Sequence, residues 1–109
     1  KSFDTFAPCG PWITSTDEIA DPQNLQLITR INGQIRQNSS SKNMFIGIPS
    51  IVSQLSKVMT LEKGDIIATG TPEGVAMNNP DFPFLKDGDS IEMEIEKLGK
   101  IQNTVKFID

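Results

Sequence analysis

The asparagine–glycine pair at positions 32 and 33 constrains the fold of this chain more than any other feature. Apolar and polar residues alternate over residues 25–31, and the alternation resumes at Ile35. Asparagine and glycine are the residues that best tolerate the two positive φ angles of a tight hairpin turn. The pattern therefore predicts two antiparallel strands joined at Asn32–Gly33.

A second hairpin is predicted near the C-terminus. Over residues 91–96 three apolar residues alternate with Glu92, Glu94 and Glu96, the chain turns around Leu98–Gly99, and a further apolar run returns toward Phe107. Alternation with period two is typical of strands that have one face in water. Three carboxylates at this spacing could also present oxygens to a hard cation. We favour the solvated strand face.

One helix is predicted between the two hairpins. Apolar residues fall at helical spacing over residues 48–59, Pro49 lies where a first-turn proline is tolerated, and Gly64 lies just beyond the end. We expect this helix to lay its apolar stripe on the sheet. The predicted fold class is α+β, mostly β, with one packed amphipathic helix.

Composition narrows the classes of partner. The 109 residues suit one domain and carry a net charge of −4, with lysines and arginines scattered along the chain. This pattern lacks the basic patch that nucleic-acid binding requires. The sequence also has neither an apolar run of eighteen residues nor an export signal at its N-terminus. We therefore expect no nucleic-acid or membrane partner and a cytoplasmic location.

Few other residues suggest a site. Cys9 is the only cysteine, which excludes an internal disulfide and a cysteine-built zinc site, and it is interpreted as a buried or incidental thiol. The sequence has no histidine, the commonest general base at neutral pH. The stretch 87–89 resembles part of a calcium loop, but the other ligand positions of such a loop are missing, so it is interpreted as a turn.

The stretch Thr69-Gly70-Thr71-Pro72 has a stronger chemical interpretation. Ile66 and Ile67 predict a buried strand that leads into it. Two hydroxyls and the backbone N–H groups beside a glycine are donors that suit a carboxylate or a developing oxyanion. The alternative is a strand that ends in a plain turn, and the tetrapeptide by itself favours that alternative.

Longer segments carry a family resemblance. KSFDTFAPCGPW (1–12), ADPQNLQLITRINGQIRQ (20–37), VMTLEKGDIIATGTPEGVA (58–76) and FLKDGDSIEMEIEKLGKIQNTV (84–105), in this order, resemble the C-terminal portion of the fumarylacetoacetate hydrolase family. The resemblance runs nearly end to end. It implies a mixed β-roll fold, with residues 1–109 forming a C-terminal segment of the catalytic domain whose upstream part is missing.

The resemblance also implies a site. In the family, the lysine that here is Lys1 points into the active site, and the threonine that here is Thr71, beside Gly70, contacts the substrate. Family substrates are small oxo-acids such as acylpyruvates, oxaloacetate or fumarylacetoacetate, held by a divalent cation, usually Mg²⁺ but also Mn²⁺ or Ca²⁺. An enolate forms during the reaction. The expected complete protein is a homodimeric hydrolase, decarboxylase or isomerase.

The departures from the family pattern limit this expectation. The family's acidic metal ligands lie upstream of the segment that this chain matches, and so do the histidine and glutamate that activate water in hydrolytic members. Ala76 replaces a frequent glycine, and Cys9 replaces a larger apolar residue. We expect the chain to be a piece of a longer polypeptide and to be inactive alone. The alternative function is a non-catalytic β-rich scaffold or assembly domain.

Overall fold

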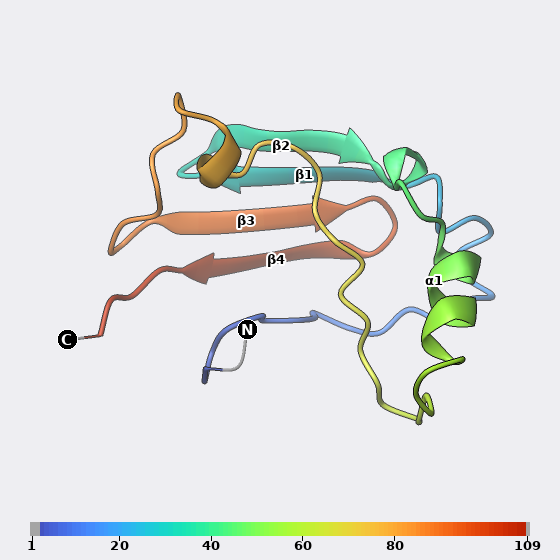
Figure 1. Ribbon diagram of the computed structural model, residues 1–109. Coiled ribbons are helices and arrows are strands. Elements are labelled where there is room, and N and C mark those ends of the chain that lie inside the picture. Colours follow the sequence, from blue (N-terminus) through green and yellow to red (C-terminus); the bar gives the residue numbers. More distant parts are fainter. Residues whose placement is uncertain (1–2, 109) are drawn as a thin grey trace.

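Four strands of the computed structural model form one antiparallel sheet, in the spatial order β2-β1-β3-β4 (Figure 1). The structure describes residues 3–108 of the chain. In chain order the elements are β1 (Gln26–Ile31), β2 (Gln34–Ser40), the 3-10 helix η1 (Ser41–Asn43), α1 (Ile48–Leu55), the 3-10 helix η2 (Ala76–Asn78), β3 (Ser90–Ile95) and β4 (Gly99–Thr104).

Both predicted hairpins are confirmed. β1 and β2 pair antiparallel across Asn32 and Gly33, whose φ angles are 50° and 79°. β3 and β4 pair antiparallel across a turn that ends at Gly99, with a φ angle of 85°. β1 also pairs with β3, so each hairpin contributes one central strand and one edge strand. The mostly-β architecture expected from the sequence is therefore present.

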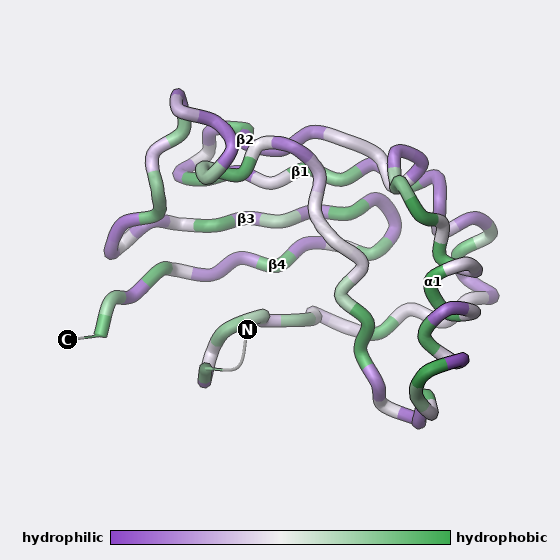
Figure 2. Tube along the Cα trace, in the orientation of Figure 1, coloured by the Kyte–Doolittle hydropathy of each residue, from purple (hydrophilic) through white to green (hydrophobic). Residues whose placement is uncertain are grey.

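The two faces of the sheet differ in chemistry, as period-two alternation requires. One face carries Thr29 and Ile31 of β1 opposite Met93 and Ile91 of β3, and loop residues lie over it; we call it the loop-covered face. Figure 2 shows the alternation of apolar and polar residues along the strands.

The opposite, charged face carries an ion-pair network. Arg30 Nη1 lies 2.9 Å from Glu92 Oε1 and 3.1 Å from Glu94 Oε2, and Lys100 Nζ lies 2.9 Å from Glu92 Oε2. This arrangement accounts for Glu92 and Glu94 as residues of the charged strand face, tied to basic neighbours on the adjoining strands. Glu96 follows β3, and its Oε2 accepts the Gln26 N–H.

The helix is shorter than predicted and lies beyond one end of the strands (Figure 1). It begins at Ile48 as expected but ends at Leu55, where the Ser56 hydroxyl donates to the Ser53 carbonyl. Val58 and Met59, which were expected to continue the stripe, follow the helix and are exposed. The stripe is therefore covered only in part and does not lie across the sheet.

Few apolar side chains are fully enclosed. Ile19 and Leu25 are the buried hydrophobic residues of the part of the chain that the structure describes, with 8% and 5% of their surface exposed. Leu25 is fixed at the entry to β1, where its N–H donates to the Ser41 hydroxyl. Much of the sheet surface thus depends on loops for cover.

The Cys9 side chain is exposed, so the possibility of a buried thiol is wrong.

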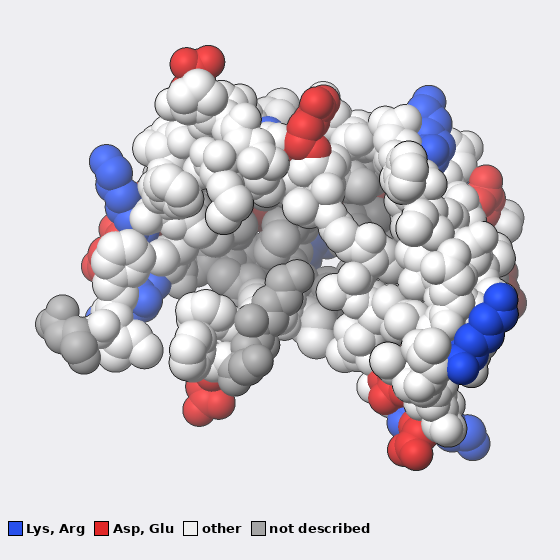
Figure 3. Space-filling view, in the orientation of Figure 1, with Lys and Arg blue, Asp and Glu red and all other residues white. Residues whose placement is uncertain are grey.

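The stretch 87–89 is a turn, as predicted. Asp87 Oδ1 accepts the Phe107 N–H, and Asp89 Oδ2 accepts the Lys86 N–H. On the face in Figure 3 the basic side chains are separate from one another. Within residues 3–108, no helix has the length and apolarity to cross a membrane.

Candidate functional site

The segment that contains Ile66 and Ile67 is extended but belongs to no strand, so the predicted strand is wrong. In Figure 1 this segment, in yellow, runs from below α1 toward the top of the sheet. A β-strand needs a hydrogen-bonded partner strand, and no strand within the described residues pairs with it. Ile66 is 79% exposed, which also contradicts the predicted burial.

Gly70 follows this extended segment, in a stretch that forms neither a helix nor a strand. Its φ angle is +118°, a conformation that residues with a side chain rarely adopt. Apart from Gly70 itself and the residues directly before and after it, no residue of the described chain has an atom within 4 Å of the place where a Cβ would stand. Glycine is therefore required here by the backbone conformation, and the space beside it is open to a ligand.

Thr71 is exposed, and a side chain from the sheet holds its hydroxyl group. Gln37 Nε2 donates to Thr71 Oγ1 over 2.8 Å and to the Pro72 carbonyl over 3.0 Å. These two bonds tie Thr71 and Pro72 to β2. Of the residues predicted from the family resemblance, Gly70 and Thr71 therefore lie together at a defined place, beside the loop-covered face. Lys1 lies outside the described residues.

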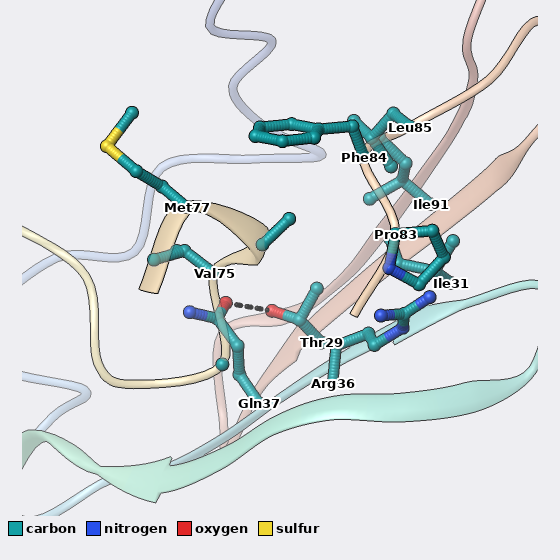
Figure 4. A pocket seen from close by; sticks show the side chains of 12 residues that line it. Thr29, Ile31, Arg36, Gln37, Val75, Met77, Pro83, Phe84, Leu85 and Ile91 are labelled. Carbon is teal, nitrogen blue, oxygen red and sulfur yellow. Dashed lines mark hydrogen bonds between the residues drawn. The ribbon is translucent and has the colours of Figure 1, made fainter. Parts of the chain in front are cut away.

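A β-bulge in β2 directs Gln37 toward Thr71 and Pro72. Thr29 pairs with Gln37 and Arg30 pairs with Ile35, so Arg36 is an extra residue in β2. Neighbouring residues of a regular strand point to opposite faces, whereas a bulge can turn two successive side chains to one face. Figure 4 shows Arg36 and Gln37 rising together from β2.

Gly74 fits against the bulge. A Cβ on this residue would overlap the Arg36 carbonyl oxygen, and the φ angle of Gly74 is +102°. Only glycine can lie this close to the strand backbone in this conformation. The contact brings the loop that follows Thr71 down onto the sheet.

A cavity of about 360 Å³ lies next to Gln37 (Figure 4). Its walls come from β1, the β2 bulge, β3, the segment around η2 and the loop before β3, and they consist of Thr29, Ile31, Arg36, Gln37, Gly74, Val75, Ala76, Met77, Pro83, Phe84, Leu85 and Ile91. The guanidinium of Arg36 lies over the Phe82 ring, 4.4 Å from its centroid. Arg36 Nε is buried and has no hydrogen-bond partner in the described chain. The cavity is thus apolar, with one cation at its wall.

The arrangement can bind and orient an anionic oxygen but offers no metal site. Residues 3–108 contain no group of three or more acidic, cysteine or histidine side chains that could hold a metal ion. Glu92 and Glu94 are already paired with Arg30. A divalent cation therefore does not fit the residues that are described.

Sequence reasoning missed Gln37, Thr29 and Arg36. A two-residue turn at Asn32–Gly33 without a bulge would pair Thr29 with Arg36, which places Gln37 on the other face. The extra residue reverses this assignment, and β2 itself carries no local signal for it. The glycine at position 74, distant in sequence, is the residue that fits the bulge.

Comparison with known proteins gives one family. The sequence profile described as the fumarylacetoacetate (FAA) hydrolase C-terminal family matches residues 1–106. Among curated proteins, the oxaloacetate tautomerase YisK of Bacillus subtilis is 44% identical over 105 residues, which are 96% of this chain and 35% of that protein.

Two solved structures extend the comparison. The fumarylacetoacetate hydrolase of Exiguobacterium antarcticum has a TM-score of 0.93 and 44% identity over 99% of this chain and 39% of its own. The maleylpyruvate hydrolase of Sphingobium sp. SYK-6, solved in complex with manganese(II) and pyruvate, has a TM-score of 0.80 and 39% identity over 89% of this chain and 34% of its own. This chain spans 34–39% of the length of these relatives.

Proposed function

The chain belongs to the fumarylacetoacetate hydrolase family, and we propose that it is the C-terminal segment of the catalytic domain of an enzyme that acts on small oxo-acids. The single observation that carries the proposal is the state of the Thr71 hydroxyl. Its oxygen accepts a hydrogen bond from Gln37 Nε2, and Thr71 is exposed beside the open space at Gly70. The hydroxyl proton is therefore free to bond to an oxygen atom of a substrate.

The names of the relatives support the substrate class. One is named for oxaloacetate and another for maleylpyruvate, and both compounds are 2-oxo acids. Reactions at the carbon next to the ketone of such acids pass through an enolate, in which negative charge develops on the ketone oxygen. A fixed hydroxyl donor at this oxygen lowers the barrier because it bonds more strongly to the enolate than to the ketone.

Keto–enol interconversion of oxaloacetate is the reaction that we place first. YisK, which is 44% identical over 105 residues of this chain, is named an oxaloacetate tautomerase. Tautomerisation moves only a proton and needs no activated water. Hydrolysis of acylpyruvates and decarboxylation of oxaloacetate are the competing activities of the same site.

Two further parts complete the proposed site. Lys1, at the head of the Lys-Ser-Phe-Asp segment, supplies a positive charge for the substrate carboxylate. A divalent cation, Mg²⁺ in the first instance, would be held by residues outside this chain, since the described residues do not fit one. The complete enzyme is expected to be a homodimer.

An assay of the complete polypeptide tests the proposal. The protein would be incubated with oxaloacetate and a panel of acylpyruvates in the presence of Mg²⁺, and the ultraviolet absorbance of the enol would be followed. We expect catalysed interconversion of the keto and enol forms of oxaloacetate. If the protein turns over none of these acids, the alternative function, a non-catalytic scaffold or assembly domain, replaces the proposed one.

A further inference from the structure

The side-chain amide of Gln37 makes three hydrogen bonds to described residues, and together they fix its orientation. Gln37 Oε1 accepts from the Thr29 hydroxyl over 2.8 Å, from the residue directly opposite on β1 (Figure 4). Gln37 Nε2 donates to Thr71 Oγ1 and to the Pro72 carbonyl. The oxygen and both hydrogens of the amide group are therefore used.

The direction of these bonds follows from the chemistry of the partners. The Pro72 carbonyl can only accept, so the atom that faces it must be the donor nitrogen of the amide. The same nitrogen faces Thr71, so Thr71 Oγ1 must be the acceptor in that bond. Its own hydrogen cannot point back to Gln37 and is directed elsewhere.

We propose that Gln37 is a positioning residue that sets the Thr71 hydroxyl as a hydrogen-bond donor toward the substrate; this inference rests on the proposed function. Gln37 does not touch the substrate itself. It acts by fixing where Thr71 Oγ1 lies and by occupying one of its lone pairs, and a hydroxyl that accepts a hydrogen bond becomes a better donor. Thr29 holds the amide in this orientation from the other side.

A thermodynamic cycle in the complete enzyme separates this role from a structural one. Gln37→Met removes the amide with little change in length, and Gln102→Met is the matched control on β4, where the Gln102 amide donates to the Ser90 hydroxyl on the charged face. We expect Gln37→Met to lower kcat about tenfold with little change in KM, the factor that corresponds to one ordinary hydrogen bond. Gln102→Met should leave kcat unchanged.

The second arm of the cycle repeats Gln37→Met in a Thr71→Val background. If Gln37 acts through the Thr71 hydroxyl, this substitution has no further effect on kcat once the hydroxyl is absent. In a Thr71→Ser background, which keeps a hydroxyl, the tenfold effect should persist. A loss in the Thr71→Val background equal to the loss in the wild type would overturn the inference, as would wild-type kcat for Gln37→Met.

Two measurements keep the test decisive if Gln37→Met folds poorly or if the proposed function fails. Thr29→Val removes the bond that orients the amide while leaving Gln37 in place, and we expect a smaller loss of kcat in the same direction.

The side-chain amide proton resonances of Gln37 report its hydrogen bond to Thr71 without any turnover. They should shift in Thr71→Val and stay unchanged in Thr69→Val, and an unshifted Thr71→Val spectrum would refute the inference even for an inactive protein.

Discussion

The backbone of Gly74 lies directly against the carbonyl oxygen of Arg36, the extra residue of the β2 bulge. A Cβ at position 74 would overlap this oxygen, whereas a Cβ at Gly70 would enter open space. Both glycines have a φ angle that side chains disfavour, +102° and +118°. Alanine substitutions at the two positions therefore distinguish the energetic cost of steric overlap from the cost of backbone strain.

We predict that Gly74→Ala destabilises the complete enzyme more than Gly70→Ala does. Each substitution introduces backbone strain of about 1–3 kcal/mol. Gly74→Ala adds an overlap with rigid backbone that costs about a further 1–3 kcal/mol. Urea denaturation of both variants measures the two free energies of unfolding. Equal losses would mean that the loop does not lie on the bulge as described.

A pH-dependent contribution to stability is predicted for Glu92. The pKa of this carboxyl group is held below its ordinary value of 4.5, first by the hydrogen bond and charge of Lys100 and then by the charge of Arg30. Because the pKa is lower in the folded state, the stabilisation is present above the pKa of the unfolded chain and is lost as the pH falls through the folded value.

Glu92→Gln should therefore lower the melting temperature slightly at neutral pH, and this difference should shrink as the pH falls below 4.5 and vanish once the carboxyl group is protonated in both states. Added salt should reduce the difference at neutral pH. Glu73→Gln is the control for loss of one negative charge, because Glu73 is exposed and takes part in none of the ion pairs between described residues. If the loss of melting temperature caused by Glu92→Gln grows as the pH falls, Glu92 is not stabilised by its ion pairs as described.

Residues 1–109 alone are predicted to be marginally stable and to associate. Ile19 and Leu25 are the buried hydrophobic residues within 3–108, while Ile13, Phe45 and Ile108 are almost fully exposed. Exposed apolar surface on this scale favours association. Sedimentation and thermal denaturation followed by circular dichroism measure both properties. A monomer that melts sharply above about 60 °C, in the upper range for mesophilic domains, would contradict the prediction.

The same segment is predicted to bind Mg²⁺ no more tightly than millimolar. A hard cation needs several convergent oxygens, and residues 3–108 present no group of three acidic side chains. Titration calorimetry measures the affinity. A stoichiometric site tighter than about 10 µM, some 7 kcal/mol of binding free energy, would return Glu92, Glu94 and Glu96 to consideration as ligands.

Features with a local cause were predictable from the sequence, and features with a distant cause were not. The turn at Asn32–Gly33 follows from the φ preferences of two adjacent residues, so the hairpin was predicted correctly. The helix start at Ile48 was also correct, but its end was not. The apolar spacing continues past Leu55, whereas the Ser56 hydroxyl competes for a helix carbonyl, and the last turn tightens.

The chemistry of the Thr-Gly-Thr-Pro stretch and then the family resemblance pointed to Gly70 and Thr71, whose role in a site stays a prediction. Gln37 depends on a bulge that no pattern within β2 indicates. Ile66 and Ile67 have the composition of a strand, yet a strand exists only if another strand pairs with it, and a partner cannot be predicted from the segment alone.

The turnover of Thr71→Val on oxaloacetate tests the central claim most directly. Val removes the donor and keeps the shape of the side chain, and Thr69→Val is the matched control two residues earlier. We predict that Thr71→Val lowers kcat roughly 10²-fold, about 3 kcal/mol, the cost of losing one donor to a developing oxyanion. The melting temperature should be little changed, Thr69→Val should be milder, and Lys1→Met should reduce kcat at least as much. If Thr71→Val retains more than half of the wild-type kcat, Thr-Gly-Thr-Pro is a plain turn and the proposed role of Thr71 is wrong.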